Sequence, residues 1–181
     1  MNENLEIEYK MMVSREEFNT LRQLCPEQTC LVQRNVYYDC TPSTTLKRMA
    51  MRIRDLENRH IFTLKIPVEQ GVREIEMDLP ENSVEAFNDP QIRKLFESLD
   101  LHYPVIPLGE MTTHRYLRVY PEGELCMDYS IINGRDDYEI EFEISTYPVT
   151  GKAFFLDLLH QAGLEYRENH NSKFARCVLN K

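Results

Sequence analysis

The stretch Glu6-Ile7-Glu8-Tyr9-Lys10, near the start of the chain, alternates charged and apolar residues. Successive side chains of a β-strand point to opposite faces, so this stretch would place its three charges on one face and its apolar groups on the other. A single amphipathic strand could carry such a pattern by chance. The fold is indicated by the recurrence of the pattern along the chain, with a change in the sign of the charges.

Three later stretches repeat the alternation, each with charged residues at every second position. The basic row is Arg52 and Arg54, and the acidic rows are Glu74, Glu76 and Asp78 and then Glu139, Glu141 and Glu143. Apolar residues occupy the positions between them, which is typical of strands with one buried face. Acidic and basic rows of comparable size suit a site that holds metal cations and a polyanion together.

The length of 181 residues predicts one compact domain, residues 1–181, that is large enough to bury a core. A hydrophobic content of 42% and a charged content of 28% are ordinary for a globular protein. The net charge of −9 argues against a general nucleic-acid-binding protein, which would usually be basic. Net charge says little about a concave site, so a local basic pocket stays open.

The sequence contains no apolar run of the roughly 18 residues that a membrane-spanning helix needs. The N-terminus, MNENLEIEYK, lacks the basic and apolar regions of a signal peptide. We therefore expect a cytoplasmic protein with no membrane partner, and we leave a homodimer open. The five cysteines are odd in number and include no C-x-x-C pair, which favours reduced thiols over a zinc or disulfide framework.

Antiparallel strands dominate the expected secondary structure, with a few helices between them. The strands are expected at about 4–13, 29–40, 48–57, 60–67, 71–79, 111–120, 124–132 and 136–145. Helices are expected at about 14–25, 83–99 and 150–162. Ser14 and Glu17 have the spacing of a capping box at the start of the first helix. Asp89-Pro90 should interrupt the second helix, and Asn133-Gly134 is a strong hairpin signal.

Eight such strands can protect their edges by closing into a barrel or by stacking as a sandwich. In a sandwich the charged faces would look into bulk water, where a row of like charges gains nothing from its neighbours. In a closed barrel the rows would converge on a shared interior with room for side chains and one small ligand. Buried charges must be paired or bind ions. We therefore predict an α+β fold, a closed antiparallel eight-stranded β-barrel (a tunnel) with flanking helices.

The residue types indicate phosphoryl chemistry. Carboxylate oxygens suit Mg²⁺ or Mn²⁺, and the five histidines show no ligand spacing that would favour Zn²⁺. Glu6 and Glu8 should lie roughly 7 Å apart along a strand, so one ion would be held by carboxylates of different strands, here one of these two with Glu139, Glu141 or Asp128. A cation that bridges phosphate oxygens and orients a water is sufficient for phosphoryl transfer. The absence of a P-loop excludes the Walker mode of nucleotide binding.

In these motifs the chain resembles the CYTH, or triphosphate tunnel metalloenzyme, superfamily, which includes class IV adenylyl cyclases, thiamine triphosphatases and inorganic triphosphatases. The superfamily's signature, E-x-E-x-K on an N-terminal strand, reads EIEYK here. The further motifs follow in order, with R-x-R at Arg52 and Arg54, a lysine at Lys65 in FTLKI, E-x-E at Glu74 and Glu76, an arginine at Arg115 in TTHRYLR, an aspartate at Asp128, E-x-E at Glu139 and Glu141, and a basic residue at Lys173 in NSKFAR. The ordered series, which spans nearly the whole chain, carries the resemblance.

The resemblance implies a role for each matched position. Divalent ions would bind to Glu6, Glu8, Asp128, Glu139 and Glu141. The triphosphate would bind to Lys10, Arg52, Arg54, Lys65, Arg115 and Lys173. Catalysis would rest on Glu6, Glu8, Lys10, Glu139 and Glu141.

Three assignments have alternatives. Glu143 continues the acidic row, so Glu141 and Glu143 are a second candidate for the metal-binding pair. Arg118 lies on the opposite strand face from Arg115, which we favour because its face also carries Thr113. Glu74, together with Glu76 in the same row, either touches the metal or braces the basic rows through salt bridges.

The predicted function is that of a metal-dependent phosphohydrolase in which water attacks a linear triphosphate. Inorganic tripolyphosphate, thiamine triphosphate and nucleoside triphosphates would all satisfy these contacts, so the sequence does not fix the substrate. One alternative is a class IV-type adenylyl cyclase that makes cyclic AMP from ATP. Another is a non-catalytic module that binds polyphosphate or a nucleotide.

Overall fold

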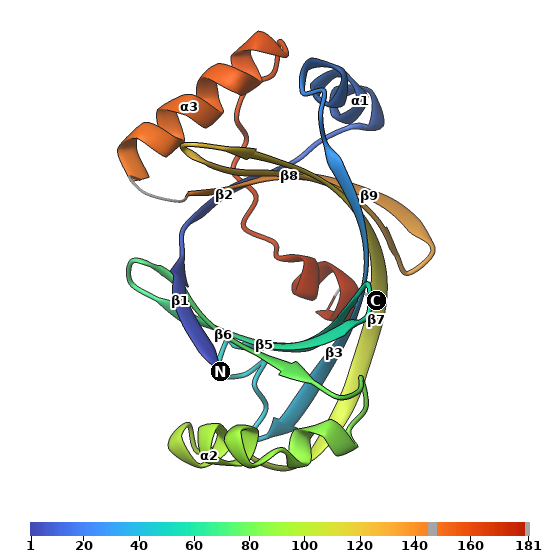
Figure 1. Ribbon diagram of the computed structural model, residues 1–181, viewed down its shortest axis with the longest axis vertical. Helices are drawn as coiled ribbons and strands as arrows, with labels where there is room; N and C mark the ends of the chain where they lie inside the picture. Colours follow the sequence, from blue (N-terminus) through green and yellow to red (C-terminus); the bar gives the residue numbers. More distant parts are fainter. Residues whose placement is uncertain (145–147, 180–181) are drawn as a thin grey trace. The chain divides into compact units, whose positions relative to one another are not determined.

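The computed structural model describes residues 1–144 and 148–179 (Figure 1). The strands are β1 (Asn2–Glu6), β2 (Glu8–Met12), β3 (Thr29–Thr41), β4 (Ala50–Leu56), β5 (Arg59–Val68), β6 (Gly71–Leu79), β7 (His102–Tyr120), β8 (Gly123–Ile132) and β9 (Arg135–Ile144). The helical elements are α1 (Arg15–Leu24), the short η1 (Glu85–Asn88), α2 (Pro90–Ser98), α3 (Pro148–Gln161) and the π-helical η2 (Ala175–Leu179). The expected α+β fold, an antiparallel sheet with flanking helices, is confirmed.

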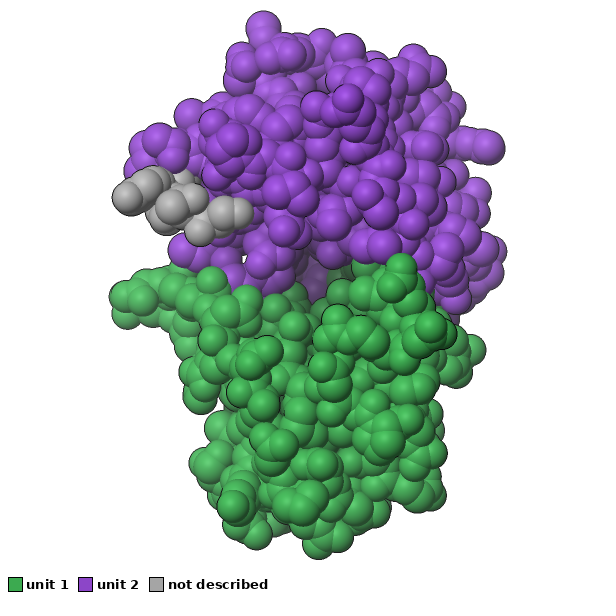
Figure 2. All heavy atoms as spheres, viewed as in Figure 1, with its two compact units in different colours: residues 1–5, 33–111, 173–181 green, residues 6–32, 112–172 purple. Residues whose placement is uncertain are grey.

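The chain divides into two compact units, which Figure 2 shows in different colours. Unit 1 contains residues 1–5, 33–111 and 173–181, and unit 2 contains residues 6–32 and 112–172. The long strands β3 and β7 each contribute residues to both units. Each unit has its own hydrophobic core and its own polar sheet face.

In unit 1 the strands are hydrogen-bonded in the order β1-β6-β5-β4-β3. Alternate residues of β4, β5 and β6, among them Ile53 and Phe62, are buried against Phe87 of η1 and Phe96 of α2. Figure 1 shows α2 along this side of unit 1. Because strand side chains alternate, the residues between these core positions, Arg52 among them, lie on the other face of the sheet.

In unit 2 the strands follow the order β7-β8-β9-β2. Ile140 and Phe142 of β9 are fully buried in a core that also contains Phe18 of α1 and Phe155 of α3. Both helices lie on the same side of this sheet in Figure 1. The acidic row of β9 therefore lies on the face that the helices do not cover.

The first strand differs from the prediction, which placed a single strand at about 4–13. Ile7 lies outside both β1 and β2, and its carbonyl accepts a hydrogen bond from the Ile144 N–H at 2.9 Å. β1 is hydrogen-bonded to β6, whereas β2 pairs with β9. This break raises the number of strands in the described ranges from the eight expected to nine. Closure into a barrel stays a prediction.

A second difference concerns β7, which begins at His102 instead of near 111. Pro104 and Pro107 lie in the added part, and proline weakens any strand prediction because it donates no ladder hydrogen bond. Other local signals are confirmed. Ser14 and Glu17 form the expected capping box. Asn133 and Gly134 adopt φ values of 51° and 75°, which suit a type I′ hairpin turn.

Asp89 caps α2, with Pro90 in the first turn, so the expected interruption between η1 and α2 is present. Within the ranges that the structure describes, no helix combines the length and the apolar character needed to cross a membrane.

Candidate metal- and phosphate-binding faces

The strand register of unit 2 brings predicted site residues together on one face. Asp128 of β8 pairs with Arg115 of β7 on one side and with Glu139 of β9 on the other. Glu141, two residues further along β9, pairs with Lys10 of β2. Residues that are paired across strands lie on the same face of a sheet. We call the carboxylates Glu8, Asp128, Glu139 and Glu141 the acidic face of unit 2.

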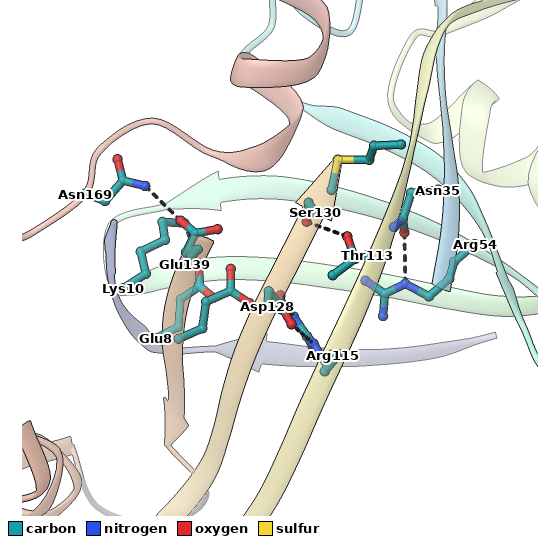
Figure 3. A network of polar contacts seen from close by, with 12 residues as sticks. Glu8, Lys10, Asn35, Arg54, Thr113, Arg115, Asp128, Ser130, Glu139 and Asn169 are labelled. Atoms are coloured by element: carbon teal, nitrogen blue, oxygen red, sulfur yellow. Dashed lines mark hydrogen bonds and ion pairs between the residues drawn. The ribbon is translucent and has the colours of Figure 1, made fainter. Parts of the chain in front are cut away.

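Arg115 binds two of these carboxylates, and Figure 3 shows its contact with Asp128. Its Nε donates to Asp128 Oδ1 at 2.8 Å, and its Nη2 donates to Asp128 Oδ2 at 2.7 Å and to Glu141 Oε2 at 2.6 Å. Burial alone would lower the pKa of Arg115, but the Asp128 and Glu141 carboxylates hold this pKa well above its ordinary value. Asp128 is fully buried, so its charge requires such a partner.

Lys10 lies among carboxylates of the same face. Its Nζ is 2.5 Å from Glu8 Oε1. Burial by itself would lower the pKa of Lys10, yet the charges of Glu8, Glu141 and Glu139 raise this pKa above its ordinary value. Lys10 is therefore positively charged at neutral pH and lies among the carboxylates of the acidic face.

The two other glutamates expected to bind metal are also buried. Glu6, at the end of β1, is 7% exposed, and Glu139 is fully buried. Asn169 donates to Glu139 Oε1 at 2.8 Å. Glu143 lies on the same face of β9 and pairs with Glu8, so the register leaves both candidate metal pairs on the acidic face.

Arg118 lies away from this group, as the strand alternation predicts. It donates to the main-chain carbonyl of Pro26, and its guanidinium lies 5.0 Å from the centre of the Tyr120 ring. Thr113, by contrast, shares the face of Arg115. Its Oγ1 lies 2.8 Å from Ser130 Oγ.

The basic row forms a polar face of unit 1. We call Arg52, Arg54 and Lys65 the basic face. Arg54 Nε donates to Asn35 Oδ1 at 3.0 Å, as Figure 3 shows. Lys65 Nζ is 3.4 Å from Glu74 Oε1, and Arg52 Nη2 is 3.8 Å from the same oxygen. Glu74 thus braces the basic face, which is one of the two roles expected of it.

Arg52 differs from its neighbours in one respect. In the part of the chain that the structure describes, its Nε is buried and has no hydrogen-bond partner. The side chain as a whole is only 14% exposed. A buried donor without an acceptor costs about 1–3 kcal/mol, so the position of this arginine calls for an explanation.

Lys173 belongs to unit 1 and precedes Phe174, whose ring packs against Tyr37 of β3 with 5.2 Å between the ring centres. The structure thus assigns Lys173 to the unit that carries the basic face.

The donor chemistry of the acidic face fits a hard divalent cation, because carboxylate oxygens are the ligands that Mg²⁺ and Mn²⁺ prefer. Across residues 1–144 and 148–179, however, no group of three or more His, Cys, Asp or Glu side chains is arranged to hold a metal ion. The carboxylates contact the cations of their own face instead: Arg115 binds Asp128 and Glu141, and Lys10 binds Glu8.

Sequence reasoning missed two uncharged residues of these faces, Asn35 and Asn169. Asn35 is 2% exposed and pairs with Arg54 across the sheet. Tyr37, two residues later in β3, pairs with Arg52, so strand alternation places Asn35 on the same face as the basic row. Asn169 lies in a segment without helix or strand, so no periodicity could have linked it to Glu139.

Comparison with known proteins gives a consistent result. The CYTH domain family matches residues 4–177. A Bacillus subtilis (strain 168) protein named "Putative triphosphatase YjbK" is 31% identical over 179 residues, which cover 94% of this chain and 93% of that protein. The crystal structure of a "putative adenylate cyclase" from Bacillus halodurans is 27% identical, with a TM-score of 0.85 over 97% of this chain and 98% of that chain. HpAC1 from Hippeastrum, 22% identical, shares the fold, with a TM-score of 0.78 over 94% of each chain.

Proposed function

The chain belongs to the CYTH domain family, and we propose that it is a cytoplasmic enzyme that hydrolyses linear triphosphates with the help of a divalent cation. The Bacillus subtilis relative, 31% identical to this chain, carries the name "Putative triphosphatase YjbK". The residues of the two polar faces support the same activity.

The buried Nε donor of Arg52 carries the proposal. It has no acceptor among the described residues, and it lies on a face that also presents Arg54 and Lys65. The three cationic side chains repel one another, and Glu74 is a carboxylate close to two of them, Arg52 and Lys65. A chain of phosphates would add negative charge to this face and would offer an acceptor oxygen to the Arg52 Nε.

The acidic face, together with Glu6, supplies the metal ligands in this proposal. Mg²⁺ or Mn²⁺ would be held by residues drawn from Glu6, Glu8, Asp128, Glu139 and Glu141. When bound, the cation would neutralise part of the phosphate charge and polarise the phosphate oxygens.

The chain's own residues would then bind and orient the reactants. Arg52 and Arg54 hold phosphate oxygens through forked hydrogen bonds, and Lys65 acts as a point charge. The resemblance in motifs gives Lys10, Arg115 and Lys173 a phosphate-binding role as well. A carboxylate of the acidic face orients the water that attacks the terminal phosphorus. The bond from this phosphorus to its bridging oxygen breaks, and tripolyphosphate yields phosphate and diphosphate.

The test is a phosphate-release assay on tripolyphosphate, thiamine triphosphate, ATP and GTP, each with Mg²⁺ or Mn²⁺. We expect release of phosphate from at least one of these substrates, and loss of release in excess chelator. Full activity in chelator would contradict the role of the cation.

Cyclisation of ATP is the second candidate, because the Bacillus halodurans relative carries the name of an adenylate cyclase and covers nearly the whole chain. Formation of cyclic AMP and diphosphate in the same assay would select it. Metal-dependent binding of tripolyphosphate without turnover would mean that the protein is a binding module.

A further inference from the structure

Asn169 brings the C-terminal segment to the acidic face of unit 2. Residues 162–172 form no helix or strand after α3, yet the Nδ2 of Asn169 lies 2.8 Å from Glu139 Oε1 (Figure 3). Glu139 is fully buried. The contact joins an uncharged residue of a loop segment to a carboxylate that we place among the metal ligands.

Neighbouring main-chain groups fix the orientation of the Asn169 amide. Its Oδ1 accepts from the Asn171 N–H at 2.9 Å, and its Nδ2 donates to the Asn171 carbonyl at 3.0 Å. A flipped amide would place Nδ2 against an N–H donor and Oδ1 against the Asn171 carbonyl and the Glu139 carboxylate. The side chain can therefore present only a donor to Glu139.

The main chain of Asn169 is anchored as well. Its N–H donates to the Lys10 carbonyl at 2.9 Å, on the strand that ends the sheet of unit 2. Three residues earlier, Tyr166 packs edge-on against Tyr9 with 6.2 Å between ring centres. Arg167 forms an ion pair of 2.9 Å with Glu17 of α1. Contacts with β2 and α1 thus hold this segment independently of the contact between Asn169 and Glu139.

We infer that Asn169 is a positioning residue for the cation, acting through Glu139, and this inference rests on the proposed function. A hydrogen bond to Oε1 restricts the orientation of the Glu139 carboxylate. Partners of this kind orient metal ligands in many sites, and their removal commonly lowers metal affinity about 10- to 100-fold. Asn169 itself touches neither the cation nor the phosphates.

The experiment measures Mn²⁺ binding directly, from the electron paramagnetic resonance signal of free Mn²⁺, in the full chain. Asn169→Ala should raise the dissociation constant of Mn²⁺ about 10- to 100-fold. His170→Ala is the matched control, because the adjacent histidine is exposed. Its Nδ1 lies 3.9 Å from Glu168 Oε1, which is a weak surface contact. We expect this control to bind Mn²⁺ within about twofold of the wild type, which is within the scatter of weak surface contacts.

A double-mutant cycle separates an effect through Glu139 from a general loss of structure. In a Glu139→Gln background, Asn169→Ala should cause little further loss of Mn²⁺ affinity, because the two residues act as one unit. Activity gives a second readout. The Mn²⁺ concentration for half-maximal activity should rise in Asn169→Ala, whereas kcat at saturating Mn²⁺ should stay close to that of the wild type. Asn169→Ser, which is too short to reach Glu139, should behave in the same way and serves if the alanine variant does not fold.

Three results would overturn the inference and leave the proposed function standing. The first is Mn²⁺ affinity within twofold of the wild type in both Asn169 variants. The second is an equal loss of affinity with and without Glu139. The third is a fall in kcat that saturating Mn²⁺ does not restore. A wild-type protein that binds no Mn²⁺ and hydrolyses no triphosphate would overturn the proposed function together with this inference, whereas a Mn²⁺-dependent wild-type triphosphatase with unaffected Asn169 variants would overturn the inference alone.

Discussion

The Nε donor of Arg52 is buried without an acceptor on the basic face of unit 1. Its Nη2 approaches Glu74 only to 3.8 Å, which is too long for a hydrogen bond. Folding alone would favour a shorter side chain or a closer acceptor at this position, because the unpaired donor destabilises the native state. An arginine here is understandable if a phosphate oxygen completes its contacts.

Replacement of this arginine tests that explanation. Arg52→Ala should weaken binding of tripolyphosphate at least tenfold, since hydrogen bonds to charged groups contribute about 1.5–3 kcal/mol each. Binding of monophosphate should change less, because fewer cationic contacts converge on the shorter anion. Arg52→Lys should be intermediate, since it keeps the charge but loses the fork. Isothermal titration calorimetry measures the affinities of the wild type and of both variants for tripolyphosphate and for monophosphate.

The matched control is Arg59→Ala. Arg59 lies on β5 of the same unit, is 60% exposed and pairs with Asp78 at 2.8 Å. Its loss should leave the affinity for tripolyphosphate unchanged. An affinity within twofold of the wild type in Arg52→Ala would mean that the anion does not bind to this face.

Removal of one negative charge on the acidic face tests the metal. Glu8→Gln keeps the shape of the side chain but releases Lys10, whose Nζ lies 2.5 Å from Glu8. The rate of phosphate release should fall by orders of magnitude, because the metal site loses one carboxylate ligand and its negative charge. Circular dichroism should show an unchanged fold. Activity close to that of the wild type would exclude Glu8 from the metal site.

At the scale of single elements, the sequence predicts features that depend on neighbouring residues better than features that depend on distant strands. The capping box of α1 and the Asn133-Gly134 turn depend on residues within a few positions of each other, so the sequence predicts them well. The break at Ile7 depends on β1 and β2 pairing with different strands, β6 and β9, which lie far apart in the sequence. Charged and apolar residues alternate in the same way on both sides of Ile7, so the sequence pattern does not predict the break.

The cap of α1 gives a prediction about stability. Ser14 Oγ accepts from the Glu17 N–H at 3.2 Å, and Glu17 accepts in return from the Ser14 N–H at 2.7 Å. Ser14→Ala should lower the free energy of unfolding by about 1 kcal/mol in urea titrations. Thr20→Ala, in the same helix, is the control, because the Thr20 hydroxyl donates to the Glu16 carbonyl within the helix and takes no part in the cap.

The same cap should be sensitive to acid. The hydrogen bond from the Ser14 N–H and the charge of Arg167 lower the pKa of Glu17 below its ordinary value. A carboxylate with a lowered native pKa stabilises the fold above its unfolded pKa, and this stabilisation is lost as the pH falls through the native pKa. Glu17→Gln should therefore be less stable than the wild type at neutral pH, and the difference should disappear in acid, once the pH has fallen below the lowered native pKa of Glu17. A constant difference at neutral and acidic pH would contradict the coupling.

At the scale of the whole molecule, the sign of each charged row and its face could be predicted from alternation alone. The pairing of charges within each unit could be predicted only in part: salt bridges from Glu74 to the basic row were one of two expected roles, whereas the partners of Arg115 were not expected. Arg115 is a cation in the acidic unit and Glu74 an anion in the basic unit, and their partners are set by strand register. Register depends on which strands meet, and alternation carries no information about that. Asn169 lay beyond prediction because its contact with Glu139 spans a segment without periodicity.

The response of the whole protein to its ligands follows from this charge distribution. A ligand that binds only the folded state raises its stability by mass action, by about 2.7 kcal/mol at a hundredfold excess over the dissociation constant. The melting temperature should rise most when tripolyphosphate and Mn²⁺ are added together, because each neutralises the charge of the other. Differential scanning fluorimetry measures the shift.

A reversal of charge at Lys10 should reduce this shift sharply. The pKa of Lys10 is raised by the surrounding carboxylates, so the residue is cationic at neutral pH. Lys10→Glu adds a further negative charge beside Glu8 and Glu141, where an incoming phosphate would be repelled. Lys152→Glu is the control, since Lys152 lies on α3, on the helix-covered side of the unit 2 sheet, with its ammonium 5.1 Å from the Tyr9 ring centre. It changes the net charge by the same amount and should leave the shift intact. An equal shift in the wild type and in Lys10→Glu would mean that the triphosphate binds away from Lys10.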